Sequence, residues 1–231
     1  MKNKSLIEKI YSSTSVEKLK KKVSLLGIYN KLDAITFLNI RFVISMSIFF
    51  LCLLIKDFGF IYAPIFTLIF YFGSEYIFID ARIKLRTSKL DYEALFFFEV
   101  LTLSLESGRN LKGALDTTVK NIDSELSKEF GSALEEIKYG KTLTEALNNM
   151  KKRIPSDTIN NVILNITQSN IFGGSIIETL YNQVDYLREK KLQETKAKIA
   201  KMPIKVSVIS VIFFIPILLL LILTPVIINM L

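Results

Sequence analysis

The chain ends in residues 204–231, which read IKVSVISVIFFIPILLLLILTPVIINML. After Lys205 this stretch carries no charged side chain, and it exceeds the roughly 20 apolar residues with which an α-helix crosses a bilayer. Pro216 and Pro225 interrupt it, but transmembrane helices tolerate proline better than soluble helices do. The stretch therefore predicts a membrane-spanning helix, which agrees with a mean hydropathy of +0.37 for the whole chain.

Two further apolar runs lie in the first third of the chain, at residues 35–55 and 58–79. Only Lys56 and Asp57 separate them, so we expect a tight transmembrane hairpin. The ionisable side chains of the three spans are chiefly Arg41, Glu75 and Lys205. All three fall toward the ends expected to be cytoplasmic, where such side chains can reach the lipid headgroups.

The distribution of Lys and Arg predicts orientation, because short basic flanks stay on the cytoplasmic side of a bilayer. Of the 30 basic residues, nine lie between Lys2 and Arg41 and nineteen between Arg82 and Lys201. The hairpin tip holds only Lys56, so we expect the tip and the C-terminus outside and the N-terminus inside. The predicted domains are a basic cytoplasmic segment at 1–34, a transmembrane hairpin at 35–79, a cytoplasmic helical domain with its stalk at 80–203, and a final span at 204–231.

The basic N-terminal segment contains Val16, Leu19, Val23 and Leu26 at helical spacing, beside several lysines. A basic amphipathic helix of this kind is able to lie on the inner leaflet, where anionic lipids attract its lysines. Because the apolar face is short, a disordered basic tail is the alternative.

Three turns in the middle segment share one pattern at a period of 32 to 33 residues. Each has a glycine where a helix can end in the left-handed conformation, then a side-chain oxygen that can cap the next helix. The pairs Thr142 with Glu145 and Ser175 with Glu178 have the spacing of a capping box. The residues of the three turns are Gly108, Asn110, Leu111 and Leu115; Gly140, Thr142, Leu143, Glu145 and Leu147; and Gly173, Gly174, Ser175, Glu178 and Leu180.

One-sided apolar stripes mark six helices around these turns, which is typical of bundle packing rather than of strands. The predicted fold class is all-α: a polytopic membrane protein with a cytoplasmic six-helix bundle made of three helical hairpins. The first helix, at 90–105, is apolar on a second side through Phe96, Val100 and Leu103. We expect it either to be the most buried helix or to face a partner. After Leu187 the sixth helix becomes a charged stalk, which fits either a solvated face or a docking surface.

The composition argues against enzymatic chemistry. The chain has no His and one cysteine, Cys52, so the commonest metal ligand and neutral-pH proton shuttle is missing. No phosphate-binding G-x-x-x-x-G-K-[ST] loop is present, and surface acids such as Glu106 lack a visible catalytic partner. The net charge of +8 comes from interleaved acids and bases, which disfavours nucleic acid. We expect no enzymatic activity, no cofactor, no metal and no nucleic-acid partner.

The sequence of residues 103–108, followed by Leu111 and then residues 140–147, resembles the F domain of type II secretion systems. Residues 172–175 and the closing apolar span fit the same family, so the resemblance covers about Leu90 to the C-terminus. A single such domain behind an N-terminal hairpin is similar to the short platform proteins of tight-adherence (Tad) pili. The related platform proteins of type II secretion and type IV pili carry two F domains, which implies that this chain needs a paralogue or a second copy of itself.

The resemblance implies a multi-pass inner-membrane platform protein that couples a cytoplasmic secretion ATPase to pilin extraction and filament assembly. The partners that it implies are this ATPase, pilin transmembrane helices and another platform subunit, in addition to membrane lipids. The candidate partner contacts are Glu106 and Arg109 at the first turn, and Arg188 and Lys191 in the stalk. The alternative is a membrane-anchored helical-repeat adaptor or scaffold, because the hairpin period is also close to that of tetratricopeptide arrays.

Overall fold

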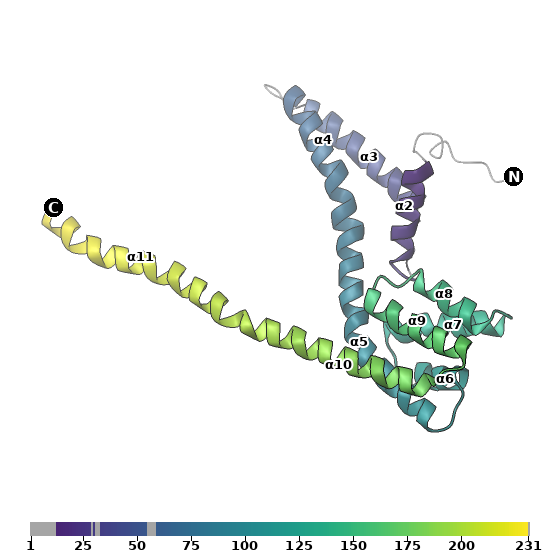
Figure 1. Cartoon of the computed structure of the whole chain (residues 1–231). Helices are drawn as coiled ribbons and strands as arrows, with labels where there is room; N and C mark the ends of the chain where they lie inside the picture. Colours follow the sequence, from purple (N-terminus) through teal and green to yellow (C-terminus); the bar gives the residue numbers. More distant parts are fainter. Residues whose placement is uncertain (1–12, 29, 31–32, 55–58, 231) are drawn as a thin grey trace. The chain divides into compact units, whose positions relative to one another are not determined.

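The computed structural model of the protein describes residues 13–28, 30, 33–54 and 59–230 (Figure 1). These residues are mostly helical, and no strand occurs among them. The chain divides into two compact units, Met1–Gln183 and Val184–Leu231. The elements are α2 (Ser13–Ser24), α3 (Ala34–Leu53), α4 (Gly59–Glu75), the π-helix η1 (Tyr76–Asp80), α5 (Ala81–Glu106), α6 (Leu111–Asn121), α7 (Glu125–Lys138), α8 (Leu143–Lys151), α9 (Asp157–Phe172), α10 (Ile176–Ala200) and α11 (Met202–Met230).

Three helical stretches are long and apolar enough to cross a membrane, namely Ala34–Leu53, Tyr62–Glu106 and Ile176–Thr224. The first is α3 and the second begins in α4, and these two helices pack side by side. This confirms the predicted all-helical fold with three candidate spans. The predicted hairpin tip at residues 55–58 lies outside the described residues.

The second apolar helix does not end at Ile79, where the apolar pattern ends. Helix α4, the π turn η1 and α5 follow one another without a gap from Gly59 to Glu106. Residues 80–89 contain neither Gly nor Pro, so nothing in them breaks a helix once packing favours it. The helix that leaves the apolar hairpin is therefore also the first helix of the helical domain.

The N-terminal segment forms helix α2, which excludes the disordered alternative for Ser13–Ser24. Its apolar residues Val16 and Leu19 are buried in a cluster with Phe37, Leu38 and Ile79. The apolar side of α2 therefore faces protein instead of the inner leaflet, because the start of α3 and the π turn cover it.

The core of the helical domain is built on α5. Phe97 on α5 stacks on Phe130 of α7 with ring centroids 4.6 Å apart, and Phe98 meets the same ring edge-on at 6.1 Å. Helix α5 packs against α6, α7 and α9. On its other side, Phe96 and Leu103 remain 60% and 63% exposed. This second apolar side is therefore not covered there by the described residues of the chain, and a partner that faces it stays a prediction.

The second unit, Val184–Leu231, contains the remainder of α10 and all of α11. In Figure 1 these two helices form the part of the chain whose colour changes from green to yellow. Only Lys201 interrupts the helical run from Ile176 to Met230. Pro203 explains this interruption, because proline cannot donate a backbone hydrogen bond and is tolerated in the first turn of a helix. The helix runs through Pro216 without a break.

Candidate functional site

Arg86 on α5 contacts three other parts of the chain: the segment after α2, helix α7 and the segment after α8. Its side chain is 6% exposed and makes ion pairs with Glu125 at 2.5 Å and with Glu129 at 2.6 Å, both on α7. Its Nη1 group donates to the backbone carbonyls of Leu25 at 2.6 Å and Arg153 at 2.7 Å. Four of the five guanidinium N–H groups are thereby used. One side chain thus ties α5 to the segments after α2, in α7 and after α8.

Glu129 extends this cluster because it is buried and accepts from two arginines. Its second oxygen lies 3.2 Å from Nε of Arg153, which also contacts Glu136 at 3.3 Å. Glu136 in turn accepts from Lys141 at 2.8 Å and from Asn149 at 3.0 Å. Lys141, and then Asn149 and Arg153, hold the pKa of the Glu136 carboxyl below its usual range. The network therefore runs from α5 through α7 to both ends of α8.

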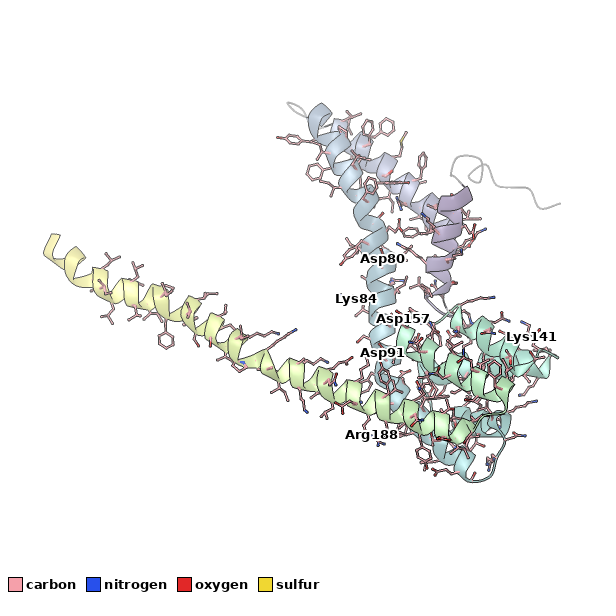
Figure 2. The ribbon with its side chains drawn as sticks, viewed as in Figure 1. Asp80, Lys84, Asp91, Lys141, Asp157 and Arg188 are labelled. Carbon is pink, nitrogen blue, oxygen red and sulfur yellow. The ribbon has the colours of Figure 1, made fainter. Side chains whose placement is uncertain are left out.

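Two acids of α5 also bind the beginnings of the helices that pack on it. Glu93 accepts from the backbone N–H of Leu126 at 3.0 Å, in the first turn of α7. Asp91 accepts a hydrogen bond from Ser156, whose hydroxyl caps α9 by accepting from the N–H of Ile159. Figure 2 shows Asp91 near Asp157, where α9 starts. Glu93 thereby satisfies an N–H group that has no partner within its own helix, and carboxylates near helix starts complement the helix dipole.

A second polar cluster surrounds the π turn. Lys22 of α2 contacts Glu75 at 2.8 Å and Asp80 at 3.0 Å. Glu75 also lies 3.3 Å from Arg41 of α3, whose guanidinium stacks on the ring of Tyr71 at 3.5 Å. The Arg41 side chain is only 7% exposed, so it does not extend outward to headgroups as its position near a span end suggested. The packing of α3 on α4 supplies its partners instead.

An open cleft of about 830 Å³ lies beside Arg86, between the segment that follows α2 and helices α5 and α7. Its wall includes Gly27, which has a φ of +94° and lies against the Arg86 guanidinium. Basic and acidic side chains both line the cleft, with Lys89 paired to Glu125 and Lys128 to Asp123. The mixed charge does not single out a ligand. Among the described residues, no group of three or more Cys, Asp or Glu side chains is placed to hold a metal ion.

The sequence-predicted turn residues lie in three separate turns and not in one site. Gly108, Gly140 and Gly173 have φ values of +82°, +98° and +70°. The side chains of Asn110, Thr142 and Ser175 each accept from a backbone N–H three residues later. Glu145 returns a hydrogen bond to the N–H of Thr142, which completes a capping box. Of the apolar turn residues, Leu111, Leu115, Leu147 and Leu180 are buried, whereas Leu143 is half-buried. Gly174 and Glu178 are exposed.

The four candidate partner contacts are exposed side chains. Glu106 ends α5, and Arg109 in the next turn donates to Thr117 at 2.8 Å. Arg188 forms a loose ion pair of 3.4 Å with Asp185, in which both side chains are more than 60% exposed. Lys191 is exposed on the same helix. All four side chains are open to solvent, and their role in binding stays a prediction.

Sequence reasoning missed Arg86, Glu129 and Arg153, although a local signal existed. Arg86 stands four residues before Leu90 and thus continues the buried stripe of α5. Glu129 lies between Leu126 and Phe130 on the inner side of α7. A charge in phase with an apolar stripe indicates burial with a partner, because an unpaired buried charge is very unfavourable.

The comparisons with known proteins gave one match. A sequence profile described as type II secretion system (T2SS), protein F, matches residues 97–224. No curated protein and no solved structure matches the chain. The matched region starts within α5 and ends within α11, so it includes the helical domain and most of the last apolar helix.

Proposed function

The chain belongs to the type II secretion system protein F family, and we propose that it is the platform protein of a tight-adherence-type pilus machine. Membership of the family and the three apolar helices support a general role as an inner-membrane platform in type II secretion or type IV pilus assembly. The proposal adds that a cytoplasmic secretion ATPase acts on the helical domain. It also adds that the resulting motion lifts pilin subunits from the bilayer into a filament.

One observation carries this coupling role: helices join the domain to apolar stretches at both of its ends. The run from Gly59 to Glu106 enters the domain, and the run from Ile176 to Met230 leaves it with only Lys201 non-helical. A continuous helix is the stiffest element that a single chain offers. Arg86 fastens the entering helix to α7. Motion imposed on the domain is therefore passed to the entering helix instead of being absorbed by a loop.

The last apolar helix supports the proposed pilin contact. After Lys205 it carries no charged side chain, so its surface is suited to packing against other transmembrane helices. Van der Waals packing drives the association of helices in lipid. Because the family resemblance extends over one F domain, we propose that a second copy of the chain or a paralogue completes the platform.

We also propose that the chain is a passive coupler without catalytic activity. The support is the absence of a phosphate-binding loop and of histidine from the sequence. Measurable ATP hydrolysis by the purified chain alone contradicts this part of the proposal.

Cysteine labelling tests the proposed topology. In a Cys52→Ser background, Leu54→Cys and Tyr139→Cys place single thiols at positions that are 83% and 89% exposed. A membrane-impermeant maleimide should label Leu54→Cys in intact cells and Tyr139→Cys only in inverted vesicles, because basic segments stay cytoplasmic. The Cys52→Ser protein, which has no cysteine, is treated in the same way as the control and should not be labelled. The reverse labelling pattern rules out the proposed orientation.

A proline in the stalk tests force transmission. Lys198→Pro lies in the exposed last turn of α10 and destabilises the helix there by about 3 kcal/mol. Filament assembly should be lost, whereas membrane insertion and co-purification with the ATPase should persist. The matched control is Lys198→Ala, which removes the same charge and keeps the helix. Normal assembly by the proline variant excludes transmission through the stalk.

A further inference from the structure

The π turn η1 stands at the point where the apolar helix α4 becomes the domain helix α5. The backbone N–H of Ala81 donates to the carbonyl of Tyr76, five residues earlier. Such turns are rare within α-helices, occur mostly as single turns, and are frequent at functional sites. In this chain, residues of α2 contact the turn directly.

The ion pairs of Lys22 require the π geometry. Glu75 precedes the turn and Asp80 ends it. The two residues are five positions apart, so in an α-helix of 3.6 residues per turn they point about 140° apart. In a π turn, residues five apart lie nearly above one another, because the i to i+5 hydrogen bond joins them. Lys22 Nζ contacts Glu75 at 2.8 Å and Asp80 at 3.0 Å. The hydrogen bond to Glu75, and to a smaller extent the one to Asp80, raises the pKa of the Lys22 ammonium and so favours its charged form.

A second contact from α2 holds the same turn. Ile79, which lies within the π turn and is 1% exposed, packs in one cluster with Val16 and Leu19. Just beyond α2, the carbonyl of Leu25 accepts from Arg86, six residues after Asp80. The N-terminal helix and the residues that follow it thus hold the connecting helix at the π turn and again inside the domain.

We propose that α2 is a clamp that keeps this turn in the π form, and that release of α2 converts the turn to α-helix. A π turn contains one residue more than a turn of α-helix. When it converts to α-helix, this residue advances the helix by one position, so α5 rotates relative to α4. That is about 100° of rotation with about 1.5 Å of lengthening. The docking of α2 thereby sets the rotational register between the second apolar helix and the helical domain. This inference concerns the conformation of one helix and does not depend on the platform function.

A distance measurement across the turn tests the clamp in the full chain, reconstituted in lipid nanodiscs. Spin labels are attached at Phe72→Cys on α4 and Leu85→Cys on α5, both 72% exposed, in a Cys52→Ser background. The parent should give one distance by electron paramagnetic resonance. Lys22→Met and, separately, Asp80→Asn should each add a second, shifted distance, because each removes one side of the clamp.

Lys21→Met is the matched control, because among the described residues Lys21 forms its ion pair with the exposed Glu17 of its own helix, and it should behave as the parent. Deletion of Ile77 places Glu75 and Asp80 four residues apart, where an α-helix already brings them to one face. In that background Lys22→Met should no longer change the distance. Parent-like distances in both Lys22→Met and Asp80→Asn overturn the proposal, and so does a Lys22→Met shift that persists after the deletion.

Discussion

Replacing Arg86 with methionine should lower the free energy of opening the helical domain by about 3–5 kcal/mol, the usual effect of removing one partner of a buried ion pair. Methionine fills similar space but removes the closer of the two arginine contacts of Glu129, whose carboxylate is 3% exposed and keeps the 3.2 Å contact to Arg153. It also leaves the carbonyls of Leu25 and Arg153 without this donor. The loss should therefore reach α7 and the segment after α2 together.

Hydrogen exchange of the full chain in detergent measures this effect through the peptide that covers Glu125–Lys138. A loss of 3 kcal/mol corresponds to exchange faster by more than about 100-fold, because about 1.4 kcal/mol is a factor of ten. Lys120→Met is the control, since its ion pair with Asp116 is largely exposed and such pairs contribute only about 0–1 kcal/mol.

A compensating substitution separates the buried charge from lost packing. Glu129→Leu added to Arg86→Met removes the carboxylate that the single variant leaves underpaired, so part of the lost stability should return. If Arg86→Met exchanges as slowly as Lys120→Met, the guanidinium does not hold the junction. The central position of Arg86 in the candidate site is then wrong.

Replacing Gly27 with alanine should lower the free energy of opening the helical domain by about 2–5 kcal/mol, the second largest expected effect. Two causes add to give this loss. Gly27 has a φ of +94°, a conformation that side chains with a Cβ adopt at a cost of about 1–2 kcal/mol. A Cβ there also lies 2.7 Å from Nη2 and 2.8 Å from Cζ of Arg86. The guanidinium cannot move aside without breaking hydrogen bonds to Glu125, Glu129 and two carbonyls.

Gly108→Ala is the matched control for the backbone cost alone. Gly108 has a φ of +82°, and an added Cβ meets nothing within 4 Å. Hydrogen exchange at α7 should therefore show that Gly27→Ala lowers the free energy of opening by about 1–3 kcal/mol more than Gly108→Ala does. In the Gly27→Ala and Arg86→Met double variant the clash is gone, so the two effects should fail to add. Equal effects of the two alanine substitutions contradict close packing of Gly27 on Arg86.

Local sequence patterns predicted the helical elements well, for physical reasons that are themselves local. A 3.6-residue apolar stripe such as Leu90, Ala94, Phe97 and Leu101 is buried as expected, because helical geometry alone places these side chains on one face. The cap at Thr142 depends on atoms three residues apart. The apolar stretches need only length and composition. Each of these features is determined within a few turns of chain.

Other features depended on residues that are distant in sequence. Residues 96–98 are three consecutive phenylalanines. The apolar stripe predicted that Phe97 is buried, and the contact of Phe98 with Phe130 decided that Phe98 is buried as well. The continuation of α4 into α5 was likewise not visible in the apolar pattern. It follows the packing of α2 and α7 along residues 75–89.

The sequence by itself determined the all-helical class, the three apolar helices, the capped turns and the family. Only the tertiary structure identified the partners of Arg86 and of Lys22, because Glu129 and Glu75 lie 43 and 53 positions away. The physical reason is that a charged side chain is buried only where folding supplies partners that offset the loss of hydration. The free energy of burying the charge depends on whether folding brings an opposite charge and hydrogen-bonding groups close to it. A local sequence pattern does not identify these distant partners.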